Sequence, residues 1–373
     1  MEPYNPFLIA GYHSPKYFCD RRQETADLTG ALYNGRNLTL ISPRRMGKTG
    51  LVKNAFYLLK EEHPDIITLY MDIYSTLNLN DFVQLLATTV LGSLDSAPQK
   101  AMKRIVKFIK SCRPGFTFDE KTGIPKIVID VAPASEEATL KEIFEYLQSS
   151  EKRCYIAIDE FQQIAEYPEK NVEALLRSYI QFLPLVNFVF AGSKQHVMQE
   201  MFLSAKRPFY QSTQILSLES IDRQEYYTFA AEFFSNRQTE LSEETFANIY
   251  DAFGGHTWYI QAVFNRLYSF GRTPDTALVN EAVEEIISES TFAYETLLSA
   301  YTPANIRLLK AIAHEGCVKE INAGEFINKY RLKAASSINS SLKKLVDKEL
   351  VYKSLDGYSV YDRFMAVWLR RLP

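Results

Sequence analysis

Residues 42–49 combine side chains and backbone groups that could hold a nucleotide phosphate. The segment Ser-Pro-Arg-Arg-Met-Gly-Lys-Thr follows a short apolar run at 37–41 and precedes a pattern typical of a helix. It matches the phosphate-loop pattern G-x-x-x-x-G-K-[ST], except that Ser42 replaces the first glycine. In such a loop, successive N–H groups point at the phosphates and the following helix adds its positive dipole end. The spacing therefore predicts a phosphate site.

The side chains of this loop have distinct expected roles. Lys48 can reach the β- and γ-phosphates, the Thr49 hydroxyl can bind Mg²⁺, and Gly47 leaves room for close backbone approach. The expected nucleotide-binding residues of the loop are Pro43, Arg44, Arg45, Met46, Gly47, Lys48, Thr49 and Gly50. The alternative is an ordinary loop with surface charges, and the lack of glycine at position 42 favours that alternative.

A second segment, 154–160, supports the nucleotide interpretation. It is an apolar strand pattern that ends in Asp159 and Glu160. We expect Asp159 to hold Mg²⁺, directly or through water, and Glu160 to orient and polarise the attacking water. The alternative is a buried strand that meets solvent at an acidic turn.

A third strand pattern, 186–191, ends in Gly192-Ser193-Lys194. A small polar group at this strand end could touch the γ-phosphate or its water, although a simple turn would also explain these residues. Strands alternate with helices over about 190 residues, which predicts an α/β core with a mostly parallel sheet covered on both faces. Residues 100–111 are expected to be helical, and residues 115–132 to form a hairpin-like insertion, more often decorative than functional.

The composition is that of an ordinary globular protein. The 373 residues are 46% hydrophobic and 23% charged. The sequence has no run of 18 apolar residues and begins without a signal-peptide pattern, so we expect no membrane span. Its four cysteines are scattered without metal-ligand spacing, which favours reduced thiols and a cytoplasmic location.

Two further regions follow the predicted nucleotide-binding domain, 1–221. Residues 222–301 have a helical pattern throughout and are expected to form a separate helical domain. Within them, Gly254-Gly255-His256 ends one helix and begins the next, so His256 could face a phosphate. A structural histidine in a helix-helix turn is the more common alternative.

Residues 302–373 predict a winged helix-turn-helix domain: three helices, then a hairpin with a glycine-containing turn. This segment carries 13 Lys and Arg against 7 Asp and Glu, a net +6, whereas the rest of the chain carries a net −9. The charge favours nucleic acid as a partner of this domain. The third helix would contact DNA through Ser336, Ser337, Asn339, Ser340, Lys343 and Lys344.

These motifs together resemble the archaeal-type ATPase family, part of the STAND group of AAA+-related P-loop NTPases. The resemblance covers nearly the whole chain. It rests on Asn5-Pro6-Phe7, on Tyr17-Phe18-Cys19-Asp20-Arg21, on residues 42–49 and 157–161, on Phe190-Ala191-Gly192-Ser193, on Arg207-Pro208-Phe209, on Gly254-Gly255-His256, and on Tyr361-Asp362-Arg363-Phe364 with Trp368. Family members tolerate a residue other than glycine at the first loop position.

The resemblance implies an ATP-dependent switch with a nucleotide-binding α/β domain, a helical lid and a winged helix. It places Phe18 and Arg21 near the adenine and gives Ser193 the sensor position. It also implies that Arg207 senses the γ-phosphate, in cis or from a neighbouring copy, and that His256 marks the turn at which the lid touches nucleotide.

Three functions remain open at this stage. The first is a Mg²⁺-dependent ATPase that couples ATP or ADP binding to DNA or a protein partner. Whether its hydrolysis is slow and gated by the partner stays open. The second is a non-hydrolysing, nucleotide-gated DNA-binding regulator that uses Lys343 and Lys344. The third is an oligomeric signalling scaffold that contacts protein partners or further copies of itself.

Overall fold

The computed structural model describes residues 2–91, 93, 112–118, 125–131, 135–354 and 356–372, with the backbone alone for 112–118 and 125–130. Contacts divide the described chain into two compact units. Residues 10–226 form the first, here called the α/β unit, and residues 2–9 with 227–373 form the second, the helical unit. The chain therefore passes from one unit to the other twice, after residue 9 and after residue 226.

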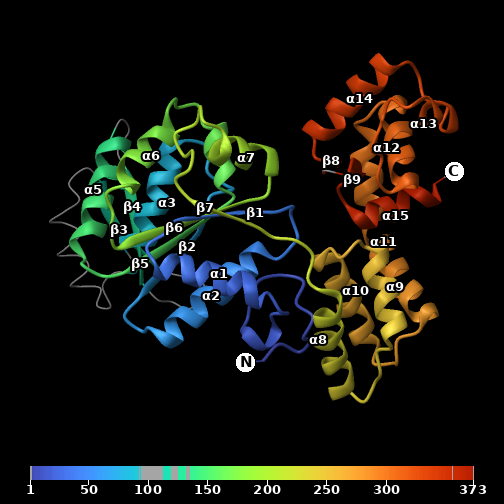
Figure 1. Ribbon diagram of the computed structural model, residues 1–373, viewed down its shortest axis with the longest axis horizontal. Helices are drawn as coiled ribbons and strands as arrows, with labels where there is room; N and C mark the ends of the chain where they lie inside the picture. Colours follow the sequence, from blue (N-terminus) through green and yellow to red (C-terminus); the bar gives the residue numbers. More distant parts are fainter. Residues whose placement is uncertain are drawn as a thin grey trace. The chain divides into compact units, whose positions relative to one another are not determined.

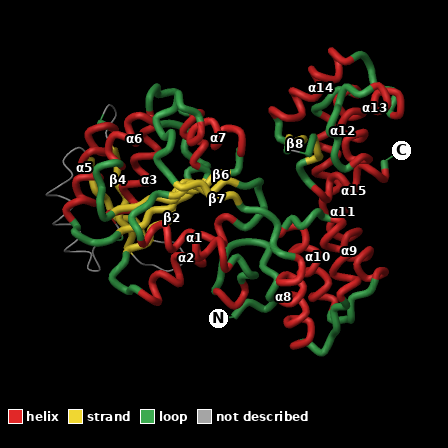
Figure 2. The backbone as a smooth tube through the Cα atoms, viewed as in Figure 1, coloured by secondary structure: helices red, strands yellow, loops and turns green. Residues whose placement is uncertain are grey.

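The α/β unit is built on a five-stranded parallel sheet with the order β2-β5-β6-β1-β7 (Figure 2). The strands are β1 (Leu38–Ile41), β2 (Ile67–Asp72), β5 (Cys154–Asp159), β6 (Val186–Gly192) and β7 (Gln214–Ser217). This confirms the predicted α/β fold. Because all five strands are parallel, the residues that follow β1, β5 and β6 meet at one edge of the sheet.

Helices cover both faces of this sheet (Figure 1). One face packs against α1 (Arg22–Tyr33) and α2 (Lys48–Glu62), and the other against α3 (Leu79–Leu91), α5 (Glu136–Ser149), α6 (Val172–Ile180) and α7 (Gln195–Leu203). Strand β5 shows the alternation that produces two cores, since Tyr155 and Ala157 join the first and Ile156 and Ile158 the second. A fully buried side chain of the size of isoleucine contributes about 1.5–3 kcal/mol to folding.

The inserted segment forms an antiparallel pair of strands, as predicted. Strand β3 (Cys112–Phe118) pairs with β4 (Pro125–Val131) from Cys112 opposite Val131 to Phe118 opposite Pro125. The turn between them and the helix expected at 100–111 lie outside the described residues.

The helical unit begins with a short segment from the start of the chain. Phe7 is fully buried. The rings around it come from α8 (Arg223–Asn236) and α10 (Thr257–Phe270), namely Phe229, Phe233, Phe234, Phe264 and Tyr268. Two hydrogen bonds fix the segment further: Asn5 Nδ2 donates to the Asn265 carbonyl at 2.9 Å, and Asn265 Nδ2 donates to the Phe7 carbonyl at 2.7 Å. The first residues are thus an integral part of this unit.

The rest of the helical unit includes the predicted winged helix. Helices α9 (Glu243–Ala252) and α11 (Thr276–Ser299) lead to α12 (Pro303–Glu315), α13 (Gly324–Lys329) and α14 (Ala335–Asp347). The wing is the antiparallel pair β8 (Val351–Lys353) and β9 (Tyr358–Val360), and α15 (Arg363–Arg371) ends the chain. Helix α15 buries Phe364 against Tyr259 of α10, with ring centroids 5.2 Å apart, and so ties the winged helix to the preceding helices.

Among the described residues, no helix has the length and apolarity that a membrane crossing requires. Cys19, Cys154 and Cys317 carry free thiols, and the first two are buried.

Candidate nucleotide-binding site

The predicted phosphate loop connects the end of β1 to the first turn of α2. Gly47 has φ +93°, a conformation that favours glycine, and a Cβ at this position would meet no atom within 4 Å. Ser42 is fully buried, lies outside the left-handed region, and donates its hydroxyl to the Pro43 carbonyl at 3.0 Å. The loop therefore requires glycine's conformational freedom at position 47 and does not require it at position 42.

Lys48 is held inside the curve of this loop. Its side chain is buried, and Nζ donates to the carbonyl oxygens of Ser42 at 3.2 Å and of Pro43 at 3.3 Å. Burial lowers the pKa of Lys48, and the nearby carboxylates of Glu160 and Asp159 oppose that effect. The ammonium group thus lies among neutral carbonyls, near two acidic groups, in a position that anionic phosphates would stabilise.

Asp159 connects the phosphate loop to the end of β5. Its Oδ2 accepts hydrogen bonds from the Thr49 hydroxyl at 2.7 Å and from the Tyr70 hydroxyl at 2.6 Å. Its Oδ1 accepts from the Glu160 backbone N–H at 3.0 Å. Because β6 lies between β1 and β5 in the sheet, the Thr49–Asp159 hydrogen bond connects the segment that follows β1 to the end of a strand that is not its neighbour. Thr49 and Asp159, predicted separately from two motifs, meet in the structure.

These two side chains fit a Mg²⁺ site. Hydroxyl and carboxylate oxygens are the hard donors that Mg²⁺ prefers, and in nucleotide sites it takes few protein ligands because phosphates and waters supply the rest. Among the described residues, no group of three or more His, Cys, Asp or Glu has metal-binding geometry.

Glu160 and Ser193 also meet. Glu160 follows β5 with φ +56°, and Ser193 follows β6. The Ser193 hydroxyl donates to Glu160 Oε2 at 2.7 Å. The side-chain amide of Gln162 donates to the same oxygen. Hydrogen bonds of this kind hold a carboxylate in one orientation, as a group that polarises water requires.

The residues expected near the adenine pack against the phosphate loop and the start of α2. Arg21 is almost fully buried, and its guanidinium donates to the carbonyls of Met46 at 3.3 Å and of Glu219. Phe18 lies so close to Gly50 that a Cβ there would be 3.1 Å from its ring. Both side chains therefore belong to the surroundings of the loop.

Two other predicted site residues, Arg207 and His256, have contacts of a different kind. Arg207 forms ion pairs with Glu173 and, at 3.6 Å, with Glu200, so its guanidinium is bound to acidic side chains of α6 and α7. His256 precedes α10 in the helical unit, 5.9 Å from the Tyr259 ring between centroids. Their roles toward a nucleotide stay predictions.

Three further side chains lie near the carboxylates, and the sequence interpretation missed two of them, Tyr70 and Gln162. Tyr70 and Gln162 donate to Asp159 and Glu160 as described above, and Asp72 lies opposite Asp159 in the β2–β5 register. Burial raises the pKa of Asp72, and Asp159 and Glu160 raise it further. The position of Gln162, two residues after Glu160, could have indicated its contact with that carboxylate. The contact of Tyr70 with Asp159 could be predicted only from the knowledge that β2 lies beside β5.

The third helix of the winged helix, α14, has the polar face that was predicted. Ile338, Leu342 and Leu345 are buried, and Lys343 and Lys344 are exposed. The other expected DNA-contacting residues are Ser336, Asn339 and Ser340, which are exposed, and Ser337, which is half-buried.

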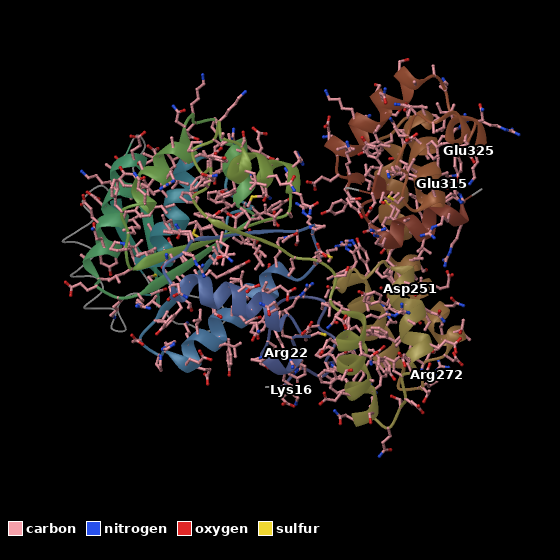
Figure 3. All side chains as sticks on the ribbon, viewed as in Figure 1. Lys16, Arg22, Asp251, Arg272, Glu315 and Glu325 are labelled. Atoms are coloured by element: carbon pink, nitrogen blue, oxygen red, sulfur yellow. The ribbon has the colours of Figure 1, made fainter. Side chains whose placement is uncertain are left out.

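Acidic side chains also occur in this domain: Glu315 and Glu325 lie on α12 and α13 (Figure 3). Glu315 accepts hydrogen bonds from Lys329 Nζ at 2.6 Å and from the Tyr330 hydroxyl at 2.7 Å. Lys329 of α13 is therefore paired with an acidic side chain, whereas Lys343 and Lys344 of α14 are exposed.

Comparisons with known proteins agree with this geometry. The family described as an ATPase domain predominantly from Archaea matches residues 18–263, and a winged helix domain family matches residues 292–371. A Walker-type ATPase of Pyrococcus abyssi is similar in structure, with a TM-score of 0.68, 16% identity, and coverage of 98% of this chain and 99% of that one.

Two ORC proteins of Aeropyrum pernix have a similar fold. The Aeropyrum pernix ORC2 protein, solved with ADPNP and ADP, has a TM-score of 0.61, 17% identity, and coverage of 98% and 95% of the two chains. The Aeropyrum pernix ORC1 protein in complex with DNA has a TM-score of 0.55, 12% identity, and coverage of 98% and 96%. A search of curated protein sequences found no significant match.

Proposed function

We propose, since the chain belongs to the family of ATPase domains found predominantly in Archaea, that its α/β unit binds ATP with Mg²⁺ and hydrolyses it as a switch. The observation that carries this proposal is the contact between two motifs 110 residues apart, the 2.7 Å hydrogen bond from Thr49 to Asp159. It joins a loop suited to phosphates to a carboxylate suited to Mg²⁺.

Each residue of the site has a task in this proposal. Lys48 and the N–H groups of the loop bind the phosphates, and Thr49 and Asp159 would hold Mg²⁺. When bound, the metal ion neutralises charge on the phosphates. Glu160 orients and polarises the attacking water, and Ser193 fixes the Glu160 carboxylate through the hydrogen bond at 2.7 Å.

The proposed switch depends on contacts that differ between the ATP-bound and ADP-bound states. Side chains that touch only the terminal phosphate can favour one conformation with ATP and release it after hydrolysis. Arg207 and His256 are the candidates for such contacts. A change of state would require Arg207 to leave Glu173, whose pKa is raised by burial and lowered by Arg207.

The test is ATP hydrolysis by the purified chain with Mg²⁺, with and without duplex DNA, beside Glu160→Gln. Because a positioned general base contributes about 10²–10⁴-fold, we expect the variant to lose at least roughly 100-fold in rate and to keep nucleotide affinity. Glu166→Gln, six residues later and exposed, is the matched control. An unchanged rate in Glu160→Gln would remove Glu160 from the mechanism.

A second candidate is a DNA-binding regulator in which nucleotide only tunes the winged helix. The exposed Lys343 and Lys344 on α14 favour it, and the ORC1 protein of similar fold was solved with DNA. Binding of ATP without turnover, together with DNA affinity that falls steeply with salt, would support this candidate. Growth of particle size on addition of ATP would instead support an oligomeric scaffold.

A further inference from the structure

Gln162 connects the end of β6 to the Glu160 carboxylate. Its side-chain Nε2 donates to Glu160 Oε2, and its Oε1 accepts from the Ser193 backbone N–H at 3.2 Å. The amide is only 2% exposed. Both the nitrogen and the oxygen of the amide are therefore hydrogen-bonded, and their partners, Glu160 and Ser193, are residues of the proposed mechanism.

The surroundings of Gln162 leave its amide little freedom. Gln162 lies in the short helix Phe161–Glu166, and its neighbour Phe161 is fully buried with its ring 4.5 Å from that of Phe190. On the other side, Gly192 provides the necessary space: a Cβ there would come within 2.5 Å of Gln162 Oε1. The backbone of Gln162 is therefore held by the packing of Phe161, and its side chain is closely packed against Gly192.

The same carboxylate oxygen receives both donors. Ser193 Oγ and Gln162 Nε2 each donate to Glu160 Oε2. Because the Gln162 amide also accepts from Ser193 N, these three residues form a closed hydrogen-bonded ring. Such a ring fixes the direction of the carboxylate more firmly than one hydrogen bond can.

We propose that Gln162 is a positioning residue for hydrolysis, which holds Glu160 in the orientation that the attacking water requires and couples it to the end of β6. This rests on the proposed hydrolytic function of Glu160. A displacement of Ser193, at the end of a strand next to the phosphate-loop strand, would then move Glu160 through the Gln162 amide. Gln162 itself does not touch the reacting atoms in this account.

Two substitutions test the proposal. Gln162→Met keeps an unbranched chain of similar length and removes both hydrogen bonds, whereas Gln162→Glu keeps the shape and replaces the donor with a carboxylate. We expect both to lower kcat about 10- to 100-fold, since misplacement of a catalytic group by about 1 Å costs roughly 100-fold. The affinity for ATP, measured with Mg²⁺ by calorimetry, should stay within about twofold, because the interaction concerns the chemical step rather than binding.

The matched control is the next residue. Gln163 has the same side chain, and its Nε2 donates to the Thr76 carbonyl at 3.1 Å, away from both carboxylates. Gln163→Met should leave kcat unchanged. The melting temperature of each variant shows whether a loss of rate reflects loss of fold, and the retained ATP affinity provides a second check on folding.

A double substitution separates positioning from a merely structural role. If Gln162 acts through Glu160, then Gln162→Met should change the residual single-turnover rate of Glu160→Gln by less than about twofold, because the carboxylate that it orients has been replaced. A full additional loss in that background would overturn the proposal, as would a normal kcat in Gln162→Met. If wild type and Glu160→Gln hydrolyse ATP equally, the proposed role of Glu160 fails and this inference fails with it, whereas a wild type that does not hydrolyse ATP would contradict the proposed function itself.

Discussion

The nucleotide site and the exposed face of α14 both gather polar and charged side chains, but they are constructed differently. Lys48 and Asp159 are buried, and each is hydrogen-bonded to other residues of the site. Lys343 and Lys344 are exposed, and Lys344 Nζ lies 5.1 Å above the Tyr301 ring. The first region is an organised site, and the second is a charged surface.

The difference predicts how each region responds to substitution. In a buried network, each group is held by the others, so a single change leaves unsatisfied partners and has a large effect. On an exposed surface, side chains act nearly independently, and their contribution to binding a polyanion is spread over several charges and screened by salt. The predictions below test this contrast.

The largest effect is expected for Lys48→Ala. The substitution removes the buried ammonium group that lies among the loop carbonyls, and charged hydrogen bonds of about 1.5–3 kcal/mol correspond to a loss of roughly 10- to 100-fold in ATP affinity for each bond lost. Isothermal titration with ATP and Mg²⁺ measures it. Lys60→Ala, at the exposed end of the same helix, is the control. Retained affinity in Lys48→Ala would contradict the assignment of the loop.

A smaller effect is expected for Tyr70→Phe, which removes one of the two hydroxyl donors to Asp159 Oδ2. Partners that orient a metal ligand typically contribute about 10- to 100-fold to metal affinity, so we expect about 10-fold more Mg²⁺ to be needed for half-maximal stabilisation of the ATP complex. Thermal melting with ATP at increasing Mg²⁺ measures this shift. Tyr57→Phe, at an exposed tyrosine of α2, should behave as wild type. An unchanged Mg²⁺ requirement would show that Thr49 and the Glu160 backbone N–H suffice to orient Asp159.

On α14, the double variant Lys343→Glu with Lys344→Glu should weaken binding to duplex DNA gradually rather than abolish it. If each lysine neutralises one phosphate, the slope of log affinity against log salt should become less steep by about 1.8. Fluorescence anisotropy at several salt concentrations measures the slope. Lys152→Glu with Lys170→Glu, which are exposed in the α/β unit, makes the same change in net charge. Equal effects of the two double variants would mean that α14 does not contact the DNA.

The sequence was sufficient to predict most of the fold because its signals are local. The apolar run before Asp159 and the Gly-Gly turn before His256 mark where elements begin and end, and the structure has a strand and a helix there. It was also sufficient to pair Thr49 with Asp159, since a phosphate loop and an acidic strand end meet at one edge of a parallel sheet.

The sequence could not supply contacts that depend on which strands are neighbours. Tyr70 reaches Asp159 only because β2 lies beside β5, and Gln162 reaches Ser193 only because β6 follows on the other side. The ion pair of Arg207 with Glu173 is equally non-local, since it joins residues 34 positions apart. Side-chain networks between strands therefore required the structure.

The smallest effect is expected for Ser42→Gly, which restores the glycine of the phosphate-loop pattern. Ser42 already has an ordinary backbone conformation, so glycine would relieve no strain there. It would remove the hydrogen bond to the Pro43 carbonyl and increase the freedom of the unfolded chain, which costs about 0.5–1 kcal/mol of stability. We expect ATP affinity to change by less than about threefold, since the Lys48 contacts use the backbone carbonyl of residue 42 and not its side chain. A large gain in affinity would mean that the loop takes a different conformation around phosphate, with a left-handed residue at position 42. In that case the loop would reach its binding conformation only when the nucleotide is bound.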